Sequence, residues 1–355
     1  MNKRLLFITP IFPKNIEEDN VVPFISQFTK RFALDTAIEI EIDIITLMYP
    51  FTTEKYSIAN INIYPLGSNF IPFFRQIPFL FRAVLKGTQL NKEHKYDGIL
   101  CFWYRESALV GRILNLILHV KQIVWMHGQD VKKSNKFLKI LKISVENMVM
   151  ISTHQKKYFY KNCGIYVDKI ANVAVDKKQF PTLNKGERKF DVIGIGNLGN
   201  LKNYSLFIEI ISQLNNKNLR ILIIGDGEEK TMLLKKIATL GLSENITLTG
   251  SLPHHEVLKH LNDAKVFLHT SKFEGNSTVI QEALYSGCKV VSTIEIETTF
   301  YIDDNFYYNT DKNHLTERID RLLHKKLIAN RIENFRMEDT IQVIYDMFYN
   351  DRKTF

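Results

Sequence analysis

Short β-rich runs alternate with helical stretches along the whole chain, and this alternation limits the fold more than any other feature. In the first half, the β-rich runs lie at residues 5–9, 40–47, 98–102, 122–125 and 148–152. In the second half, they lie at residues 190–195, 219–224, 246–249, 266–269 and 289–292. Strands that alternate with helices pair in parallel and are covered by those helices. The sequence therefore predicts an α/β protein with two doubly wound parallel sheets.

A polar, charged stretch between residues 176 and 189 interrupts the alternation and marks the predicted domain boundary. We expect an N-terminal domain at 1–183, a C-terminal domain at 184–336 and a final helical segment at 337–355. A chain of 355 residues with 45% hydrophobic content is long enough for two cores. In the final segment, Ile341, Ile344, Tyr345 and Phe348 have the spacing of one helix face, so this helix must pack on a domain.

Cysteine content and hydropathy exclude several classes of protein. The three cysteines, Cys101, Cys163 and Cys288, are an odd number without metal-like spacing, which indicates neither a disulfide framework nor a zinc site. No apolar run approaches the roughly 18 residues that a membrane-spanning helix needs. The amino terminus runs directly into a β pattern without a cleavage region. The sequence predicts a cytoplasmic protein that does not span a membrane.

The net charge of +9 comes from the first half of the chain, where residues 1–180 hold 25 Lys and Arg against 15 Asp and Glu. Five lysines between residues 132 and 142 alternate with apolar residues, and residues 70–82 mix aromatic side chains with arginine. One interpretation is a solvated helix face above ordinary core aromatics. The other is contact with an anionic membrane surface. Nucleic acid is not expected as a partner, because no base-reading motif or aromatic stacking platform accompanies the lysines.

Residues 273–284 contain two carboxylates separated by seven residues, Glu274 in a glycine turn and Glu282 inside a predicted helix. We expect Thr278 to cap this helix and Gln281 to close a capping box, which places Glu282 in the first turn. Free amides at the helix start and the positive dipole end suit a diphosphate or sugar hydroxyls that approach over Gly275. Ionised carboxylates accept hydrogen bonds from vicinal diols. The pattern indicates a sugar-nucleotide site.

A second glycine-rich stretch, residues 194–199, has two interpretations. Gly194, Gly196 and Gly199 match the dinucleotide fingerprint, which would indicate a nicotinamide oxidoreductase. That fingerprint requires an acidic residue about 20 positions further on, and Asp226 lies beyond that distance. The alternative is that Lys202, which follows the glycines, stabilises negative charge on a leaving diphosphate.

Segment 273–284 resembles the Glu-x7-Glu signature of the family-4-type retaining glycosyltransferases, known as glycosyl transferases group 1, which have the GT-B fold. Segments 223–227, 246–252 and 264–271 are similar to other pieces of that family in the same order. The resemblance covers nearly the whole chain and is strongest from 190 to 292. It implies two Rossmann-like domains that face each other across a cleft, with a last helix that crosses back to the first domain.

The resemblance also implies roles for the donor-side residues. Gly196 and Asn197 occupy the place of a Gly-Arg pair, and Lys202 that of the lysine that holds the diphosphate. Because Asn197 replaces the usual arginine, the diphosphate depends more on Lys202 and on helix amides. Glu282 is expected to bind the ribose. The transferred sugar is expected at Glu274 and at the backbone of Gly275, Asn276, Ser277 and Thr278.

Three further segments carry expected contacts. Ser251 and Leu252 follow a strand and are similar to the loop that holds the nucleobase through backbone atoms. His127 ends another strand, at the sheet edge where ligands of open parallel sheets bind. By resemblance to the family's His-Gly-x-Asp stretch, we expect His127 to hydrogen-bond the transferred sugar. Asp130 would orient His127 or cap the following helix.

The sequence thus predicts a retaining glycosyltransferase that moves a sugar from a nucleoside diphosphate sugar to a hydroxyl acceptor. We expect a glycan or lipid-linked acceptor at the inner face of the cell membrane. Neither a metal nor a cofactor is expected besides the nucleoside diphosphate sugar, because the Asp-x-Asp clamp of metal-dependent transferases is absent. The alternatives are a GT-B sugar-nucleotide epimerase or phosphorylase, and a partner protein that binds nucleotide sugars without catalysis.

Overall fold

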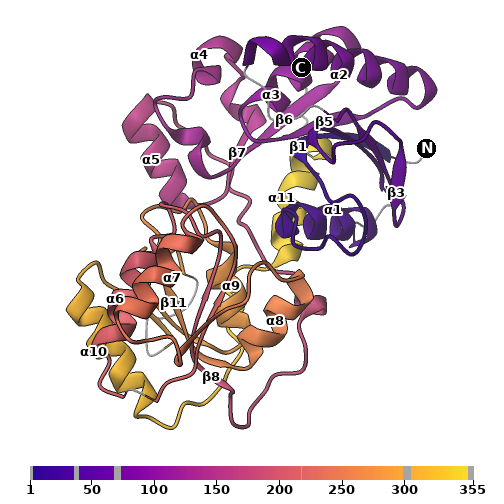
Figure 1. Ribbon diagram of the computed structural model, residues 1–355. Helices are drawn as coiled ribbons and strands as arrows, with labels where there is room; N and C mark the ends of the chain where they lie inside the picture. The colour runs from indigo at the N-terminus through magenta and orange to yellow at the C-terminus, as the bar shows by residue number, and fades with distance from the viewer. Residues whose placement is uncertain (1–2, 36–39, 68–72, 217, 299–304, 351–355) are drawn as a thin grey trace. The chain divides into compact units, whose positions relative to one another are not determined.

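The computed structural model describes residues 3–35, 40–67, 73–216, 218–298 and 305–350, with the side chains of 35 and 73–77 left out. Two compact units form the chain (Figure 1). The N-terminal unit contains Met1–Val173 and Arg336–Phe355, and the C-terminal unit contains Ala174–Phe335. The division therefore lies ten residues before the expected boundary at 183, and the segment after Val173 belongs to the C-terminal unit.

A seven-stranded sheet forms the centre of the N-terminal unit, in the order β3-β4-β2-β1-β5-β6-β7. Its strands are β1 (Lys3–Ile11), β2 (Ile40–Tyr49), β3 (Tyr56–Ile58), β4 (Ile61–Pro65), β5 (Gly98–Phe102), β6 (Lys121–Met126) and β7 (Met148–Met150). Only the β3–β4 pair is antiparallel among these seven. The strand order reverses direction between β1 and β5, which creates a switch point where ligands of open α/β sheets bind.

Helices cover both faces of this sheet. On one face lie α2 (Phe73–Glu93) and α3 (Glu106–Leu118), which contact each other and the central strands. On the other face lie α1 (Pro23–Asp35) and α11 (Met337–Tyr349), which also contact each other. Phe28 of α1 and Trp125 of β6 pack with ring centroids 4.7 Å apart. The last helix is thus part of the N-terminal unit, although the C-terminal unit precedes it in the sequence.

Shorter elements follow the last strands of this sheet. They are the 3-10 turns η1 (Gly128–Val131) and η2 (Val145–Asn147), and the helices α4 (Phe137–Leu141) and α5 (Thr153–Cys163). The buried side of α4 carries Phe137 and Leu141, which join the core under α2 and α3. Helix α5 begins with a side-chain cap, since the Ser152 hydroxyl accepts from the Gln155 amide.

The C-terminal unit is a six-stranded parallel sheet in the order β10-β9-β8-β11-β12-β13. Its strands are β8 (Phe190–Ile195), β9 (Ile221–Ile224), β10 (Ile246–Leu248), β11 (Ala264–His269), β12 (Lys289–Ser292) and β13 (Phe306–Tyr308). Counted in chain order this is 3-2-1-4-5-6, the order of a dinucleotide-type Rossmann sheet. Its switch point lies between β8 and β11.

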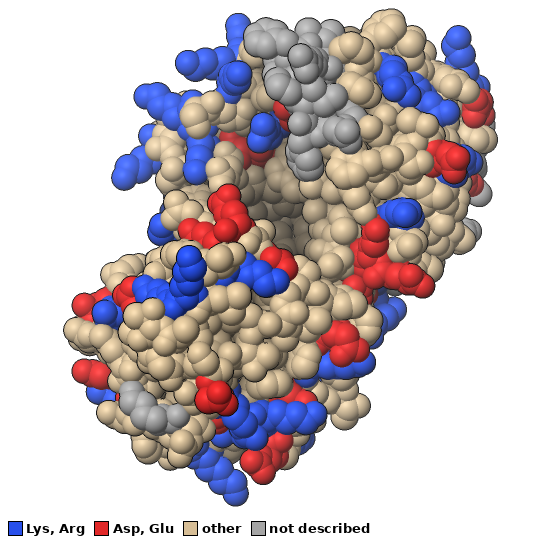
Figure 2. All heavy atoms as spheres, in the orientation of Figure 1, with Lys and Arg blue, Asp and Glu red and all other residues tan. Residues whose placement is uncertain are grey.

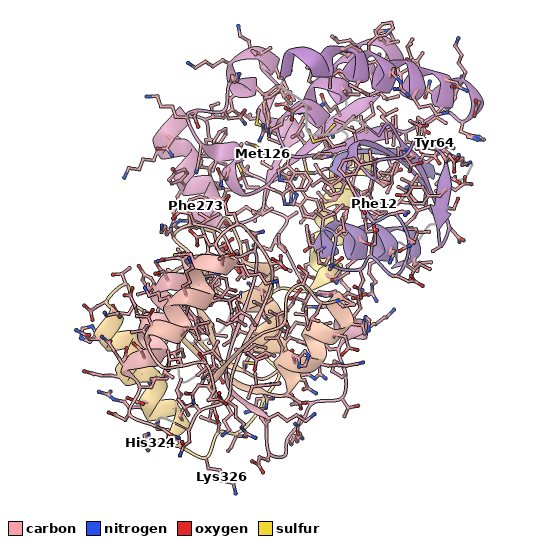
Figure 3. All side chains as sticks on the ribbon, viewed as in Figure 1. Phe12, Tyr64, Met126, Phe273, His324 and Lys326 are labelled. Atoms are coloured by element: carbon pink, nitrogen blue, oxygen red, sulfur yellow. The ribbon has the colours of Figure 1, made fainter. Side chains whose placement is uncertain are left out.

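The first element of this unit is the 3-10 turn η3 (Lys177–Gln179). Two layers of helices cover its sheet. One layer contains α6 (Tyr204–Gln213), α7 (Lys230–Thr239) and α10 (Lys312–Leu323), and the other contains α8 (His254–Asn262) and α9 (Thr278–Tyr285). Apolar residues of β8, β9, β11 and β12 face both layers. His324 and Lys326, just beyond α10, are exposed, whereas Met126 in the N-terminal unit is fully buried (Figure 3).

The predicted fold class is confirmed, and every expected strand is present within a few residues. Three short strands were not expected, namely β3, β4 and β13. Strands β3 and β4 are joined by a tight turn in which Ala59 has a positive φ of 52°, a conformation that its sequence does not announce. No helix among the described residues is long and apolar enough to cross a membrane.

Candidate active site

Lys202 and Glu274 meet at the switch point of the C-terminal sheet. Lys202 lies in the loop after β8, and Glu274 lies in the loop after β11. The Lys202 Nζ atom donates to Glu274 Oε1 over 2.5 Å, and both side chains are about one-fifth exposed. The structure therefore brings together two of the predicted site residues, 72 positions apart in the sequence.

His269, the last residue of β11, completes this group and was not predicted. Its Nε2 atom lies 3.5 Å from Glu274 Oε1 and 3.1 Å from the Ser271 hydroxyl. Burial lowers the pKa of His269, so the ring is neutral at physiological pH. The signal that could have found it is its position, because a polar residue at the carboxyl end of a buried central strand points to a ligand site.

The charge of Glu274 is stabilised by these neighbours. Burial alone raises the pKa of this carboxyl, but the hydrogen bond from His269 and the positive charge of Lys202 outweigh burial and hold it at about 2. Glu274 is therefore ionised throughout the physiological range and can only accept hydrogen bonds. That suits a carboxylate that binds hydroxyl groups.

The lowered pKa predicts how Glu274 contributes to stability. Its folded pKa lies below the ordinary value of 4.5, so its stabilising contribution is complete above that value and is lost as the pH falls towards 2. At neutral pH, Glu274→Gln should lower the free energy of unfolding by on the order of 3 kcal/mol, and the difference should shrink towards pH 3. Thermal melting of both proteins between pH 3 and pH 7 measures this difference. A pH-independent difference would contradict the assigned pKa.

Gly196 is needed because Lys202 packs against it. The φ angle of Gly196 is +149°, and a Cβ at this position would lie 3.2 Å from Lys202 Cε. Asn197, which stands in the place of an expected arginine, is exposed and donates from Nδ2 to the Asp226 carbonyl over 3.2 Å. Asn197 thus ties the loop after β8 to the loop after β9, a structural contact that its position in the sequence did not predict.

Glu282 forms a second buried pair. Its Oε1 atom lies 2.9 Å from His254 Nε2, and only 6% of each side chain is exposed. His254 is the first residue of α8 and follows the loop that contains Ser251 and Leu252. The predicted ribose carboxylate is therefore fixed by the helix that follows the predicted base-binding loop, and sequence reasoning missed His254.

The predicted start of α9 is wrong by one residue. Ser277, not Thr278, is the N-cap, and its side chain makes no cap hydrogen bond. The third helical residue is then the buried Ile280, which has no amide to reach back, so the predicted capping box cannot form. Gln281 instead donates from Nε2 to Asn276 Oδ1 over 3.3 Å.

This shift moves Glu282 out of the first turn of α9. Because the helix spans Thr278–Tyr285, Glu282 is its fifth residue. The amides of the first turn remain at the loop that carries Glu274, so an anion at the helix start and a group held by Glu282 occupy different levels of the helix.

Two backbone hydrogen bonds at glycine residues connect the loops that follow β8, β9 and β10. The Gly225 amide donates to the Gly250 carbonyl over 2.9 Å, and the Gly196 amide donates to the Ile224 carbonyl over 3.0 Å. Ser251 is exposed, whereas Leu252 is half-buried and packs on the core under α8 and α9. The side chain of Leu252 is thus occupied, which leaves backbone atoms as its means of contact with a base.

The dinucleotide fingerprint is not supported by this geometry. In that motif the third glycine opens the helix that binds the pyrophosphate. Helix α6 instead begins at Tyr204, five residues after Gly199, and Lys202 lies in the intervening loop.

In the N-terminal unit, His127 and Asp130 lie together after β6. Asp130 Oδ2 accepts from the backbone amides of His127, over 2.9 Å, and of Tyr104, over 2.8 Å. The His127 ring packs among Trp125, Phe24 and other aromatic rings, and burial lowers its pKa to about 3. Its Nε2 atom is buried and has no hydrogen-bond partner among the described residues. Asp130 therefore fixes the backbone of His127, and the ring is a neutral imidazole.

The two basic stretches differ in how much of them the structure describes. Lysines and arginines gather on the surface over α4 and α5 (Figure 2). Ile140 of α4 is 62% exposed between Lys139 and Lys142. In the other stretch, residues 70–72 lie outside the described residues, and only the backbone of 73–77 is described.

Within the described ranges, no group of three or more His, Cys, Asp or Glu side chains is arranged to hold a metal ion.

Comparison with known families identifies the C-terminal unit. Residues 175–337 match the model of the family "Glycosyl transferases group 1". The predicted resemblance to this family is thus confirmed. The match includes β8 to β13 and all the donor-side residues described above.

Two curated proteins illustrate the similarity in sequence. A Campylobacter jejuni protein, N-acetylgalactosamine-N,N'-diacetylbacillosaminyl-diphospho-undecaprenol 4-alpha-N-acetylgalactosaminyltransferase, is 33% identical over 62% of this chain. The amylovoran biosynthesis glycosyltransferase AmsD of Erwinia amylovora is 23% identical over 54% of this chain. The matches cover 63% and 57% of those two proteins, respectively.

Solved structures identify the fold of the whole chain. Sucrose-phosphate synthase from Thermosynechococcus elongatus has a TM-score of 0.74 at 15% identity, with 98% of this chain and 95% of that chain covered. A glycosyltransferase from Rickettsia africae has a TM-score of 0.73 at 15% identity, with 100% of both chains covered. At such identities the likeness concerns the fold alone, which is GT-B with two Rossmann-like parallel sheets. The predicted cleft between the two domains stays a prediction.

Proposed function

We propose that this protein is a retaining glycosyltransferase that moves a sugar from a nucleoside diphosphate sugar to a hydroxyl acceptor. The observation that carries this proposal is the Lys202–Glu274 pair beside His269 at the switch point of a group 1 transferase domain. A bare salt bridge at a protein surface is worth little. This one lies where Rossmann sheets bind their ligands, and it combines a cation for phosphate with an acceptor for hydroxyl groups.

In the proposed reaction, the bond between the sugar and the diphosphate breaks, and negative charge develops on the diphosphate. The Lys202 ammonium has three donors, so it can bond a phosphate oxygen while it keeps its bond to Glu274. The free amides at the start of α9 add positive potential. We propose that these groups replace a metal ion, and that no cofactor besides the donor is required. Glu274 and the loop from Gly275 to Thr278 hold the sugar.

Retention of configuration is proposed from the family resemblance. The acceptor hydroxyl attacks the face from which the diphosphate departs, and a diphosphate oxygen takes the hydroxyl proton. Glu282 holds the ribose diol, while Ser251 and Leu252 hold the base through their backbone. His127, as a neutral imidazole, donates or accepts one hydrogen bond to the transferred sugar.

The proposed acceptor is a lipid-linked or surface glycan. The Campylobacter relative is named for a diphospho-undecaprenol acceptor, and the Erwinia relative for amylovoran biosynthesis. The lysines near α4 and the exposed Ile140 suit peripheral contact with the anionic inner face of the cell membrane. Flotation with anionic vesicles tests this location, and equal recovery with neutral vesicles would contradict it.

A screen of nucleoside diphosphate sugars tests the reaction itself. A true donor should raise the melting temperature of the protein, because a ligand that binds only the folded state stabilises it. Transfer should then require an acceptor, whereas an epimerase would convert the donor alone and a phosphorylase would require phosphate. Absence of stabilisation by every common nucleoside diphosphate sugar would contradict the proposed function.

Glu282→Ala should weaken donor binding more than it slows turnover, because a ribose contact is made in the ground state and the transition state alike. Loss of hydrogen bonds to a charged group should raise the Michaelis constant for the donor about tenfold or more. Kinetics at varied donor concentration measure this. Glu256→Ala is the matched control, since Glu256 lies on α8 and pairs with exposed Lys259. Unchanged donor binding in Glu282→Ala would disprove the ribose assignment.

A further inference from the structure

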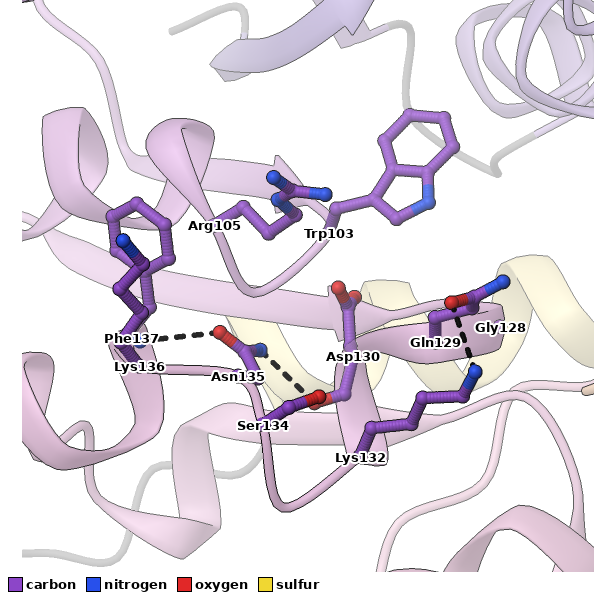
Figure 4. A pocket seen from close by; sticks show the side chains of 10 residues that line it. All are labelled: Trp103, Arg105, Gly128, Gln129, Asp130, Lys132, Ser134, Asn135, Lys136 and Phe137. Atoms are coloured by element: carbon purple, nitrogen blue, oxygen red, sulfur yellow. Dashed lines mark hydrogen bonds between the residues drawn. The ribbon is translucent and has the colours of Figure 1, made fainter. Parts of the chain in front are cut away.

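A pocket of about 580 Å³ opens in the N-terminal unit at the carboxyl ends of β5 and β6 (Figure 4). Trp103 and Arg105 follow β5, and the stretch from Gly128 to Phe137 follows β6. Its volume lies within the range of small-molecule sites and exceeds what one phosphate needs. Every residue that lines this pocket belongs to the N-terminal unit, whereas Lys202, Glu274 and Glu282 belong to the C-terminal unit.

Its frame is rigid before any ligand arrives. Asp130 accepts from the amides of Tyr104 and His127, and so joins the turns that follow β5 and β6. Asn135 Nδ2 donates to the Tyr104 carbonyl over 3.0 Å and to the Asp130 carbonyl over 2.9 Å. Both turns are therefore fixed to the loop that carries the pocket's lysines, which lowers the entropic cost of binding.

The lining is basic. Arg105, Lys132 and Lys136 line the pocket, and Asp130 is the one carboxylate among the lining residues. That carboxylate is buried and already accepts two amides, and burial raises its pKa to about 7, so its negative charge is incomplete at neutral pH. Glu106 lies 3.5 Å from Arg105, and Lys132 donates to the neutral Gln129 side chain. The lining thus holds three cationic side chains against one carboxylate, a composition that favours an anion.

Trp103 adds an aromatic wall in an unusual backbone conformation. Its φ angle is +68°, which is rare for a bulky residue. The hydrogen bond from its amide to the Trp125 carbonyl, 3.0 Å long, holds this conformation. The indole is only half-buried, and in the close view it lies beside Arg105 and across the pocket from Lys132 (Figure 4). An indole face beside cations suits a sugar ring next to a phosphate.

We propose that this pocket binds the phosphate-bearing part of the acceptor, with a phosphate or diphosphate on Arg105, Lys132 and Lys136 and the adjoining sugar against Trp103. This inference rests on the proposed function, because it assigns the acceptor side of that reaction. The shared chemistry is a sugar linked to phosphate, and two sources carry it: a polyprenyl diphosphate sugar in a membrane and a free sugar phosphate.

Tryptophan fluorescence gives a local measurement of binding. The chain has two tryptophans, and Trp125 is fully buried, so a ligand in the pocket should change mainly the emission of Trp103. Titration with inorganic pyrophosphate should change this emission, and Trp103→Phe should remove the change. A signal that survives in Trp103→Phe would overturn the proposal.

Charge variants test the contacts. Arg105→Gln and Lys132→Gln should each weaken pyrophosphate binding about tenfold, the usual effect of losing a charge-assisted hydrogen bond. Lys133→Gln is the matched control, because Lys133 is exposed on the same segment and does not line the pocket, and its binding should be unchanged. Equal weakening in all three variants would show only a diffuse basic surface and would overturn the proposal.

Two further measurements separate this inference from the proposed function and distinguish the two sources. The donor should raise the melting temperature of Arg105→Gln as much as that of the wild type. If the wild type binds the donor but pyrophosphate does not change its Trp103 emission, the pocket assignment is wrong while the transferase proposal stands. A short-chain polyprenyl diphosphate sugar and the corresponding sugar 1-phosphate should both bind with the same dependence on Arg105. Tighter binding of the polyprenyl compound indicates the lipid-linked source, and equal binding indicates the free sugar phosphate.

Discussion

Lys202→Met should lower the turnover number by about two to three orders of magnitude, the effect of losing one electrostatic donor to developing charge. The substitution keeps the aliphatic stem that packs on Gly196 and removes only the ammonium. Because the diphosphate gains charge as the glycosidic bond breaks, the loss should fall on the turnover number more than on the Michaelis constant for the donor. Initial rates at saturating donor, together with calorimetric donor binding, measure the two quantities.

A matched variant distinguishes catalysis from the loss of a salt bridge. Lys236 on α7 pairs with Glu209 on α6, in the helix layer of the same unit that also contains α10. Lys236→Met should leave the turnover number within about twofold of the wild type, because Lys236 bonds Glu209 and Ser205 rather than Glu274, and a partly exposed ion pair contributes little. Near-normal turnover in Lys202→Met, or an equal loss in Lys236→Met, would remove Lys202 from the proposed mechanism.

The sequence predicted the sheets well because parallel strands are buried on both faces and appear as continuous apolar runs. The resemblance to group 1 transferases also predicted that Lys202 and Glu274 belong to one site, and in the structure both follow strands that border the switch point of a Rossmann order. Strands β3 and β4 were missed because they lie at the sheet edge and their register depends on a turn with positive φ at Ala59.

The partners of the predicted residues were harder to foresee. His254 and His269 contact Glu282 and Glu274 across 28 and 5 positions, and no local pattern requires either contact. The start of α9 was misplaced because Ser277 and Thr278 are both good N-cap residues by type. In the structure the helix begins at Thr278 without a side-chain cap hydrogen bond, and Ile280 is buried in the core under α8 and α9. The hydrogen bonds of Asn135 and the positive φ angle of Trp103 depend on loop geometry, which sequence patterns predict least well.

The loops after β8 and β9 cross at Gly225, and substitution of this glycine should have a large effect on stability. Gly225 has a φ angle of +151°, and a Cβ there would lie 1.9 Å from the Gly196 carbonyl oxygen. The obstacle is backbone, so no side chain can move to relieve the clash. Gly225→Ala should therefore combine strain in φ with displacement of the loop after β8, for a loss of about 3 kcal/mol or more. For a unit of this size that corresponds to a fall in melting temperature of roughly 6–12 °C.

Gly241→Ala isolates the contribution of backbone strain in the same experiment. Gly241 also has a positive φ, +69°, but a Cβ there meets no atom within 4 Å. Its substitution should cost only the left-handed conformation, about 1 kcal/mol. Because Gly196 packs on Lys202, displacement of its loop in Gly225→Ala should also lower donor binding, whereas Gly241→Ala should not affect it. Comparable losses of stability in the two variants would mean that the loops after β8 and β9 do not constrain each other and that Lys202 is positioned by other contacts.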